Sequence, residues 1–205
     1  AVYFFYPEAV DRIVSEVSPP AAPEATDDAG PDATPGATML PSDTTELELS
    51  LLGAVRRGDE AEARELLGRG ANVNGRDTDG ETPLLAAAAA GNEAMMRLLL
   101  EAGASVDGRD SRGRTPLLLL SARGRTAGAA VLLEAGADPD LASKAGNFPL
   151  LEAARFGEAA LVRSLVAAGA DVNQRASNGW TALKAARDRG HTDVAELLRG
   201  AGATE

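Results

Sequence analysis

The chain has 205 residues and a formal net charge of −11, and 44% of its residues are hydrophobic although only 3% are aromatic. It contains no cysteine, which excludes disulfides and thiol chemistry. Its apolar runs, such as residues 83–90, are shorter than the ~20 residues of a membrane helix. We therefore expect a soluble protein without a membrane span, and the sequence does not decide between cytoplasm and periplasm.

The first 43 residues differ in composition from the rest of the chain. An aromatic run at residues 3–6 precedes the spacing of an amphipathic helix. Residues 1–18 are either a remnant of processing or a segment that docks on the repeats or on a partner. Residues 19–43, rich in Pro, Ala, Thr and Asp, are predicted to be a disordered acidic linker. Residues 1–43 hold eight acids and one base, a net charge of −7.

Residues 80–104 contain a complete helical unit with its own start and stop signals. Thr82 can cap a helix, and Pro83 suits the first helical position because no N–H donor is needed there. Gly91 is predicted to end this helix, and a second helix is expected from about Glu93, ended by Gly103. Such a helix pair cannot bury its own apolar face, so it needs neighbours.

The same signals recur at one constant interval along the chain. Gly-Ala pairs begin at Gly70, Gly103, Gly136, Gly169 and Gly202. Single glycines stand at Gly58, Gly91, Gly124, Gly157 and Gly190. Helix-opening triplets begin at Thr82, Thr115, Phe148 and Thr181. A fixed period of about 33 residues, with Thr-Pro-Leu opening one helix and Gly-Ala closing the next, resembles the ankyrin repeat family.

The resemblance covers residues 44–205 and implies an all-α solenoid of five helix-turn-helix repeats with β-hairpin loops. The repeats are placed at residues 44–76, 77–109, 110–142, 143–175 and 176–205. The first has no hairpin and is predicted to begin as a helix near Thr45. We expect repeats three and four to open most easily, because Gly128 weakens one helix by about 1 kcal/mol and Phe148 replaces a capping Thr. The bias toward arginine, with only two lysines, suggests a bacterial gene.

One departure from the family pattern concerns the histidine that usually follows Thr-Pro-Leu and ties neighbouring loops together. Its place is taken by Leu52, Leu85, Leu118, Leu151 and Lys184. The resemblance therefore leaves the rigidity of the hairpins without these hydrogen bonds. The single histidine, His191, follows Gly190, where the family commonly has a structural histidine, and we expect that role here.

No constellation in the sequence predicts catalysis, a cofactor or a metal site. With no cysteine and one histidine, the usual nucleophile–base pairs and zinc sites have no ligands. Asp77-Thr78-Asp79-Gly80 lacks the later acidic ligand of a calcium loop. We therefore predict a protein that is not an enzyme.

The resemblance implies that the hairpins and the ends of the first helices line a concave partner-binding face. The residues predicted to bind are Arg76, Asp79, Glu81, Arg109, Arg112, Arg114, Arg123, Lys144, Asn147, Arg155, Phe156, Arg175, Asn178, Trp180 and Arg189. A cation at a helix end also complements the helix dipole, which explains part of the set but not the hairpin arginines. The predominance of arginine favours an acidic partner, with Phe156 and Trp180 as exposed aromatic anchors.

Three interpretations of the acidic partner remain. The first is another protein, for which the resemblance suggests an inhibitor, an immunity-type protein or an accessory subunit of an enzyme. The second is the acidic segment 1–43 of the chain itself, acting as a tethered competitor. The third is nucleic acid, which the net charge and the scarcity of aromatic residues disfavour. The oligomeric state cannot be read from the sequence.

Overall fold

The computed structural model describes residues 41–204 of the chain, with side chains from residue 45 onward. The expectations for residues 1–40 therefore lie outside the described residues. The described part folds into ten helices: α1 (Pro41–Arg57), α2 (Glu60–Gly68), α3 (Pro83–Ala90), α4 (Glu93–Glu101), α5 (Pro116–Ser121), α6 (Thr126–Glu134), α7 (Pro149–Phe156), α8 (Ala159–Ala167), α9 (Ala182–Asp188) and α10 (Thr192–Gly200). No strand is assigned between residues 41 and 204.

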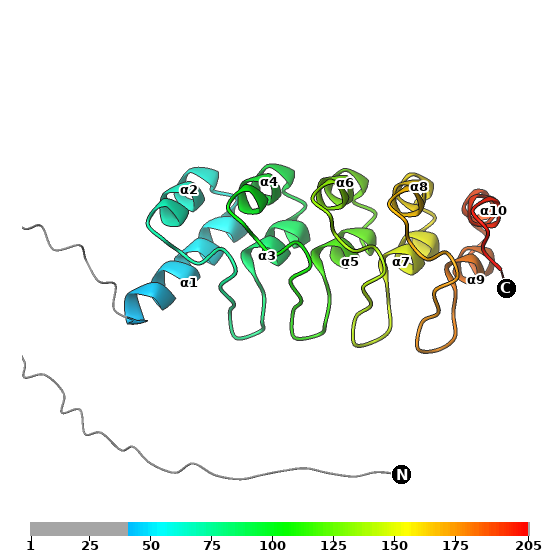
Figure 1. Ribbon diagram of the computed structural model, residues 1–205, viewed down its shortest axis with the longest axis horizontal. Coiled ribbons are helices and arrows are strands. Elements are labelled where there is room, and N and C mark those ends of the chain that lie inside the picture. Colours follow the sequence, from blue (N-terminus) through cyan, green and yellow to red (C-terminus); the bar gives the residue numbers. More distant parts are fainter. Residues whose placement is uncertain (1–40, 205) are drawn as a thin grey trace, which may run out of the picture. The chain divides into compact units, whose positions relative to one another are not determined.

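The helices pair into five layers that stack side by side (Figure 1). The odd-numbered helices form one row and the even-numbered helices a second row, and each layer contacts the next along both rows. Four long loops, residues 72–81, 105–114, 138–147 and 171–180, project from the stack side by side. This arrangement confirms the predicted all-α repeat solenoid.

Local hydrogen bonds explain where the helices begin and end. Thr82 Oγ1 accepts from the backbone N–H of Leu85 at 3.3 Å, and Asp59 caps α2 in the same way. Gly91 ends α3 with φ of +70°, which L side chains rarely adopt. The start of α1 differs from the sequence prediction, because this helix begins at Pro41 and not near Thr45. Proline at a first helical position has no N–H to leave unpaired, so the helix extends into the predicted linker.

The core is built from small and medium apolar side chains, chiefly leucine, alanine and methionine. Phe148 is the exception, because it is the largest of the fully buried side chains. As predicted, α7 has no side-chain cap at this position. A lost cap costs about 1 kcal/mol, whereas emptying a buried phenylalanine site costs about 3–5 kcal/mol. Phe148 therefore contributes more by packing than it loses by failing to cap.

Gly128 also has a packing role that its helix propensity does not predict. It is buried in α6, and a Cβ added there would lie 3.0 Å from Leu120 Cδ2 and 3.1 Å from Met96 Cε. The absence of a side chain lets α6 lie close to its neighbours. Packing therefore opposes both sequence arguments for a weak middle of the stack, the low helix propensity of Gly128 and the missing cap at Phe148. The order in which the repeats open remains a prediction.

Backbone hydrogen bonds give the loops their shape. Each loop is closed by one bond four residues apart, such as Asp77 N–H to Glu81 O at 3.1 Å and Ser143 N–H to Asn147 O at 2.8 Å. The first three loops are also joined to one another, because Ser111 N–H donates to Asp79 O and Lys144 N–H to Arg112 O. The loops therefore have a hairpin shape without an assigned strand, and we call them hairpins below.

A second set of contacts, the Asx ladder, joins neighbouring repeats through one side chain at an equivalent position in each hairpin. Its members are Asn74, Asp107, Asp140 and Asn173, which accept from the backbone N–H of Ser105, Asp138, Asp171 and Thr204. The asparagines also donate from Nδ2, Asn74 to Gly103 O and Asn173 to Gly202 O, each at 3.2 Å. A carboxylate has no donor, so Asp107 and Asp140 cannot make this second bond.

The two aspartates of the ladder carry an electrostatic cost. Burial raises the pKa of Asp107, and Asp138 adds to the rise. Burial also raises the pKa of Asp140, with added repulsion from Asp138 and Asp171. When the pKa of an aspartate is higher in the folded chain than in the unfolded chain, its protonated form favours folding. Its contribution to the free energy of unfolding is complete below the unfolded pKa of ~3.9 and is lost as pH rises through the folded pKa. At neutral pH these carboxylates therefore weaken the stack.

Replacing Phe148 with Thr tests the balance between packing and capping. The variant restores the cap of the other repeats but leaves a cavity, so we expect a net loss of about 2 kcal/mol in the free energy of unfolding. Urea unfolding followed by far-UV circular dichroism measures it. Phe148→Leu, which removes less volume, serves as the control and should cost less. A Phe148→Thr variant as stable as the wild type would contradict the packing role.

Replacing Asp107 and Asp140 with Asn should stabilise the chain at pH 7. Each amide can donate to the glycine carbonyl of the next repeat as Asn74 does, a bond worth about 0.5–1.5 kcal/mol, and each replacement removes a charge. The gain should shrink as pH falls through the raised pKa of the two aspartates, because protonation removes their charge. Thermal unfolding at several pH values measures this. The reverse variant, Asn74→Asp, should lower the unfolding temperature, and a rise would contradict the ladder.

Candidate functional site

The face formed by the hairpins and the odd-numbered helices contains the residues predicted to bind a partner. The structure divides the predicted cations into two groups. Some already have a hydrogen-bond or ion-pair partner for their side chain, and others have none among residues 45–204. The second group, the groove cations, consists of Arg112, Arg123, Lys144 and Arg189, all of them exposed.

Two hairpin arginines are structural. Arg76 Nη1 donates to Gly80 O of its own hairpin at 3.1 Å and also to the backbone carbonyl of Arg109 in the next. Arg109 Nη1 in turn donates to Ala142 O of the following hairpin at 3.1 Å. These guanidinium groups take over the loop-to-loop bonding that the missing histidines would provide. The helix dipole does not explain these two hairpin arginines, but their bonds to backbone carbonyls of the next hairpin give them a structural role that the sequence analysis did not consider.

Two other predicted cations form ion pairs within one repeat. Arg114 lies 2.7 Å from Asp110 through both Nε and Nη2, and it is half-buried. Burial opposes ionisation of Asp110, but hydrogen bonds from Arg114 hold the pKa of this carboxyl below its ordinary value. Arg155 Nη1 lies 3.1 Å from Glu152 Oε1. These two arginines are present at the face, although each is already engaged.

The predicted acids of the face are also engaged. Glu81 and Asp77 both bind Arg56, whose Nη2 lies 2.7 Å from Asp77 Oδ2. The hydrogen bond to Glu81 is the main cause that raises the pKa of Arg56. Burial alone would raise the pKa of Asp77. Hydrogen bonds from the backbone N–H of Glu81 and from the Arg56 side chain outweigh burial and lower this pKa. Asp79 is exposed, and its backbone carbonyl joins two hairpins.

The two aromatic anchors have different surroundings. Phe156, at the end of α7, is 50% exposed. Trp180 is half-buried against the core, and the ammonium of Lys184 lies 5.4 Å from its ring centroid, within cation–π range. Asn178 accepts from Trp180 N–H and so shapes the last hairpin. Trp180 is therefore not the exposed anchor that the sequence predicts.

A pocket of about 290 Å³ lies between repeats three and four, on the odd-helix side of the hairpins. We call it the central pocket, and it is lined by Arg114, Leu118, Leu119, Ala122, Arg123, Ser143, Asn147 and Glu152. Its apolar part comes from α5. Its cations are Arg123, just after that helix, and Arg114 from the hairpin. The structure thus brings together Arg114, Arg123 and Asn147 of the predicted set.

Glu152 is a residue of this pocket that the sequence analysis missed. Among residues 45–204 it is the only charged side chain that is buried, and Arg155 is its ion-pair partner. The corresponding positions in repeats two, three and five hold Ala86, Leu119 and Ala185. A charged residue at a position that is apolar in three other repeats was the signal that could have identified it.

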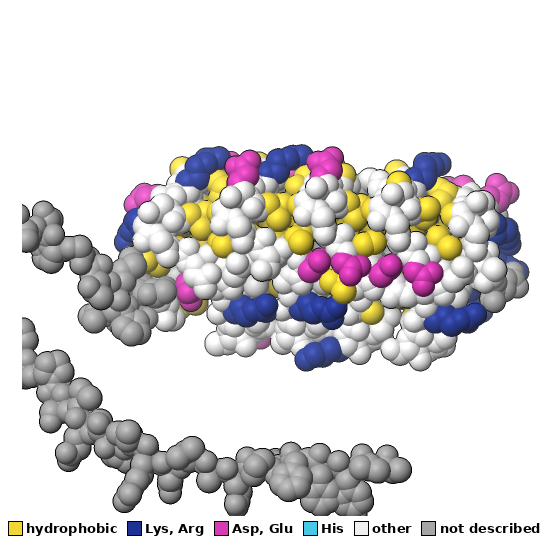
Figure 2. All heavy atoms as spheres, in the orientation of Figure 1, with side chains coloured by type: hydrophobic (Ala, Val, Ile, Leu, Met, Phe, Trp, Pro, Cys, Tyr) yellow, Lys and Arg dark blue, Asp and Glu magenta, His cyan; other side chains and the backbone are white. Residues whose placement is uncertain are grey.

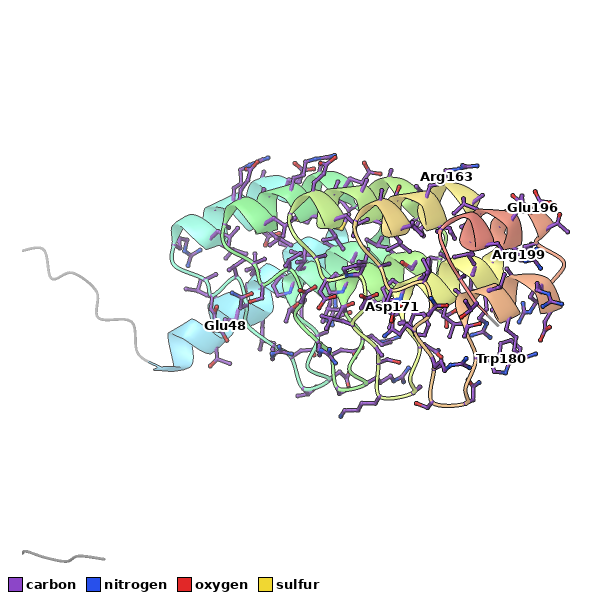
Figure 3. The ribbon with its side chains drawn as sticks, turned by 45° about the vertical axis from the view of Figure 1, so that its right-hand side comes forward. Glu48, Arg163, Asp171, Trp180, Glu196 and Arg199 are labelled. Carbon is purple, nitrogen blue, oxygen red and sulfur yellow. The ribbon has the colours of Figure 1, made fainter. Side chains whose placement is uncertain are left out.

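Charge is arranged unevenly around the stack. On the face drawn in Figure 2, acidic side chains run in a row across the middle repeats, with lysine and arginine side chains nearer the hairpin ends. The ladder bonds place Asp107 beside Asp138 and Asp140 beside Asp171. Asp171 is labelled in Figure 3, where the chain enters the last hairpin. Acidic side chains therefore gather where the chain enters the hairpins.

His191 makes the structural contact expected of it. Its Nε2 lies 3.1 Å from Arg155 O, so the ring N–H donates to the preceding repeat. Gly157 makes room for the ring, because a Cβ there would lie 2.5 Å from His191 Nδ1.

Within the described part of the chain, no group of three or more His, Cys, Asp or Glu residues is placed to hold a metal ion. None of the described helices has the length and apolar character needed to cross a membrane.

The two groups of arginines should respond differently to mutation. Arg109→Gln removes the bond to Ala142 O and should lower the free energy of unfolding by about 0.5–1.5 kcal/mol. Arg112→Gln, on the same hairpin, is the matched control and should change it by less than about 0.5 kcal/mol. Urea unfolding of both variants provides the measurement. Equal effects would contradict the division into structural and groove cations.

Comparison with known protein families assigns the chain to one of them. The family described as ankyrin repeats (3 copies) matches residues 51–143 and 132–204, together more than half of the chain. The two matches overlap from the end of α6 into the following hairpin, and together they include every described helix except the first part of α1. A search of curated proteins finds no match at the significance required. The regular repeat period, the five helix pairs and the hairpins agree with this assignment, and the chain belongs to the ankyrin repeat family.

Proposed function

We propose that this chain is a non-catalytic binding module that holds an acidic segment of a partner protein in the central pocket and on the hairpins beside it. Ankyrin repeats are protein–protein interaction modules, and this gives the general class of function. The observation that carries the finer proposal is the central pocket itself, where leucine side chains lie next to Arg123 and Arg114.

The composition of the pocket favours a segment with both apolar and acidic side chains. Leu118 and Leu119 form the apolar lining of the pocket, and burying a leucine-sized side chain of the ligand against it contributes about 1.5–3 kcal/mol. The groove cations Arg112, Arg123 and Lys144 lie around repeats three and four without an ion-pair partner among residues 45–204. Arginine matches a carboxylate through two parallel N–H bonds, so it suits recognition as well as attraction.

The positions of the acidic side chains support binding of an acidic ligand at the central pocket and not at the hairpin entrances. Asp107, Asp138, Asp140 and Asp171 lie where the chain enters the hairpins, and none of them lines the central pocket, so they repel an acidic ligand there and not at the pocket. Together with the net charge of −11, they also disfavour nucleic acid as the ligand. That the partner is an enzyme which the chain inhibits or protects is a further step of the proposal, and it rests on the family resemblance. The tethered-competitor alternative concerns residues 1–43, of which 1–40 lie outside the described residues.

A defined peptide tests the proposal before any natural partner is known. Fluorescence anisotropy would follow N-acetylated, labelled Glu-Glu-Leu-Leu-Glu-Glu on the full chain. We expect saturable binding that weakens at high salt and falls about tenfold, or ~1.4 kcal/mol, in the Arg112→Glu/Arg123→Glu variant. Neither residue bonds through its side chain within the described region, so the fold should be kept.

Two controls separate the pocket from general charge attraction. Arg163→Glu reverses an exposed charge on α8, away from the hairpins (Figure 3), and should leave the affinity unchanged. The peptides Glu-Glu-Ser-Ser-Glu-Glu and Lys-Lys-Leu-Leu-Lys-Lys test the need for apolar and acidic side chains, and both should bind more weakly. Equal binding of the lysine peptide, or equal loss in the Arg163→Glu variant, would refute the proposal.

A further inference from the structure

The last repeat differs from the other four at one position, with a consequence for its surface. Leu52, Leu85, Leu118 and Leu151 occupy equivalent positions in the first four repeats, and each is at most 3% exposed. Lys184 holds this place in repeat five, and its side chain is 53% exposed. A buried apolar contact is thus replaced by a cation at the end of the described stack.

Lys184 lines a pocket of about 310 Å³, which we call the terminal pocket, together with Arg175, Gly179, Thr181, Arg187 and Asp188. Three cations and one carboxylate meet there, a net charge of +2. The central pocket, in contrast, contains Arg114, Arg123 and Glu152, a net charge of +1, and a leucine surface that the terminal pocket lacks. The two pockets therefore differ in net charge and in apolar lining.

Neighbouring groups hold the cations of the terminal pocket in place. The Lys184 ammonium lies 3.0 Å from Asp188 Oδ2 and 5.4 Å from the centroid of the Trp180 ring. Arg175 Nη1 donates to Gly179 O at 3.4 Å, and both Arg175 and Arg187 have further interactions within the chain. A guanidinium has five N–H donors, so an arginine engaged in this way can also bind a ligand. Positioned donors lose less conformational entropy on binding than mobile ones.

We propose that the terminal pocket binds a phosphate group, with Arg175, Lys184 and Arg187 as its donors. A phosphate monoester carries a charge of about −1.5 to −2 at neutral pH and three acceptor oxygens, which matches the net charge of +2 and the three cationic side chains. The polar face of an end repeat also keeps a solenoid soluble, but solubility does not require three cations around one pocket. Inorganic phosphate and a phosphorylated side chain share this chemistry.

The single tryptophan of the chain provides the readout, because Trp180 contacts Lys184. The full chain would be titrated with inorganic phosphate and with the N-acetylated peptide Ala-Gly-phosphoserine-Gly-Ala, while Trp180 emission is recorded. Sodium chloride at matched ionic strength and the unphosphorylated peptide are the blanks. We expect a saturable change with at least the phosphopeptide. Saturation with both probes identifies the ion alone as sufficient, and saturation with the phosphopeptide alone identifies a phosphorylated protein as the source.

Variants locate the site. Arg187→Gln leaves the Lys184–Trp180 contact in place, and Lys184→Leu installs the residue of the other four repeats. Both should raise the half-saturating concentration at least fivefold. Arg163→Gln on α8 and Arg123→Glu in the central pocket should leave it unchanged, which keeps this test separate from that of the proposed function. No saturable change with either probe, or an equal shift in all four variants, would overturn the inference.

Discussion

The structure depends on the fact that no single helix pair can bury its own apolar face. Each of the five layers of two helices covers its neighbour, and the core is a continuous row of leucine and alanine side chains. This constraint requires a fixed spacing between layers. The spacing is kept by hydrogen bonds that recur from one hairpin to the next, so the polar contacts of the loops are as periodic as the core.

The same polar contacts determine which residues are free to bind. Arg76 and Arg109 reach from one hairpin to a backbone carbonyl in the next, and Asn74 and Asp107 join the loops at their base. An arginine engaged in this way contributes to the stack. Three of the four groove cations, Arg112, Arg123 and Lys144, belong to repeats three and four, and the proposed binding site lies there because the stack does not use them.

The periodic features could be predicted from the sequence, and the irregular ones could not. The helix starts after Thr82, Thr115 and Thr181 follow from local capping chemistry, so the sequence predicts them correctly. The packing roles of Phe148 and Gly128 depend on which side chains lie across the layer, and a propensity argument does not include these contacts. Arg109 illustrates the same limit at the face, because its acceptor is a backbone carbonyl that no residue pattern identifies.

The most direct test of the account uses the scarcity of lysine, since the chain has only Lys144, in the hairpin beside the central pocket, and Lys184, in the terminal pocket. Carbodiimide would couple an N-acetylated Glu- and Leu-containing peptide to the full chain, and mass spectrometry would locate the bonds. The account predicts cross-links mainly at Lys144, greatly reduced in the Arg123→Glu variant. Equal coupling at both lysines, or coupling unaffected by that variant, would contradict it.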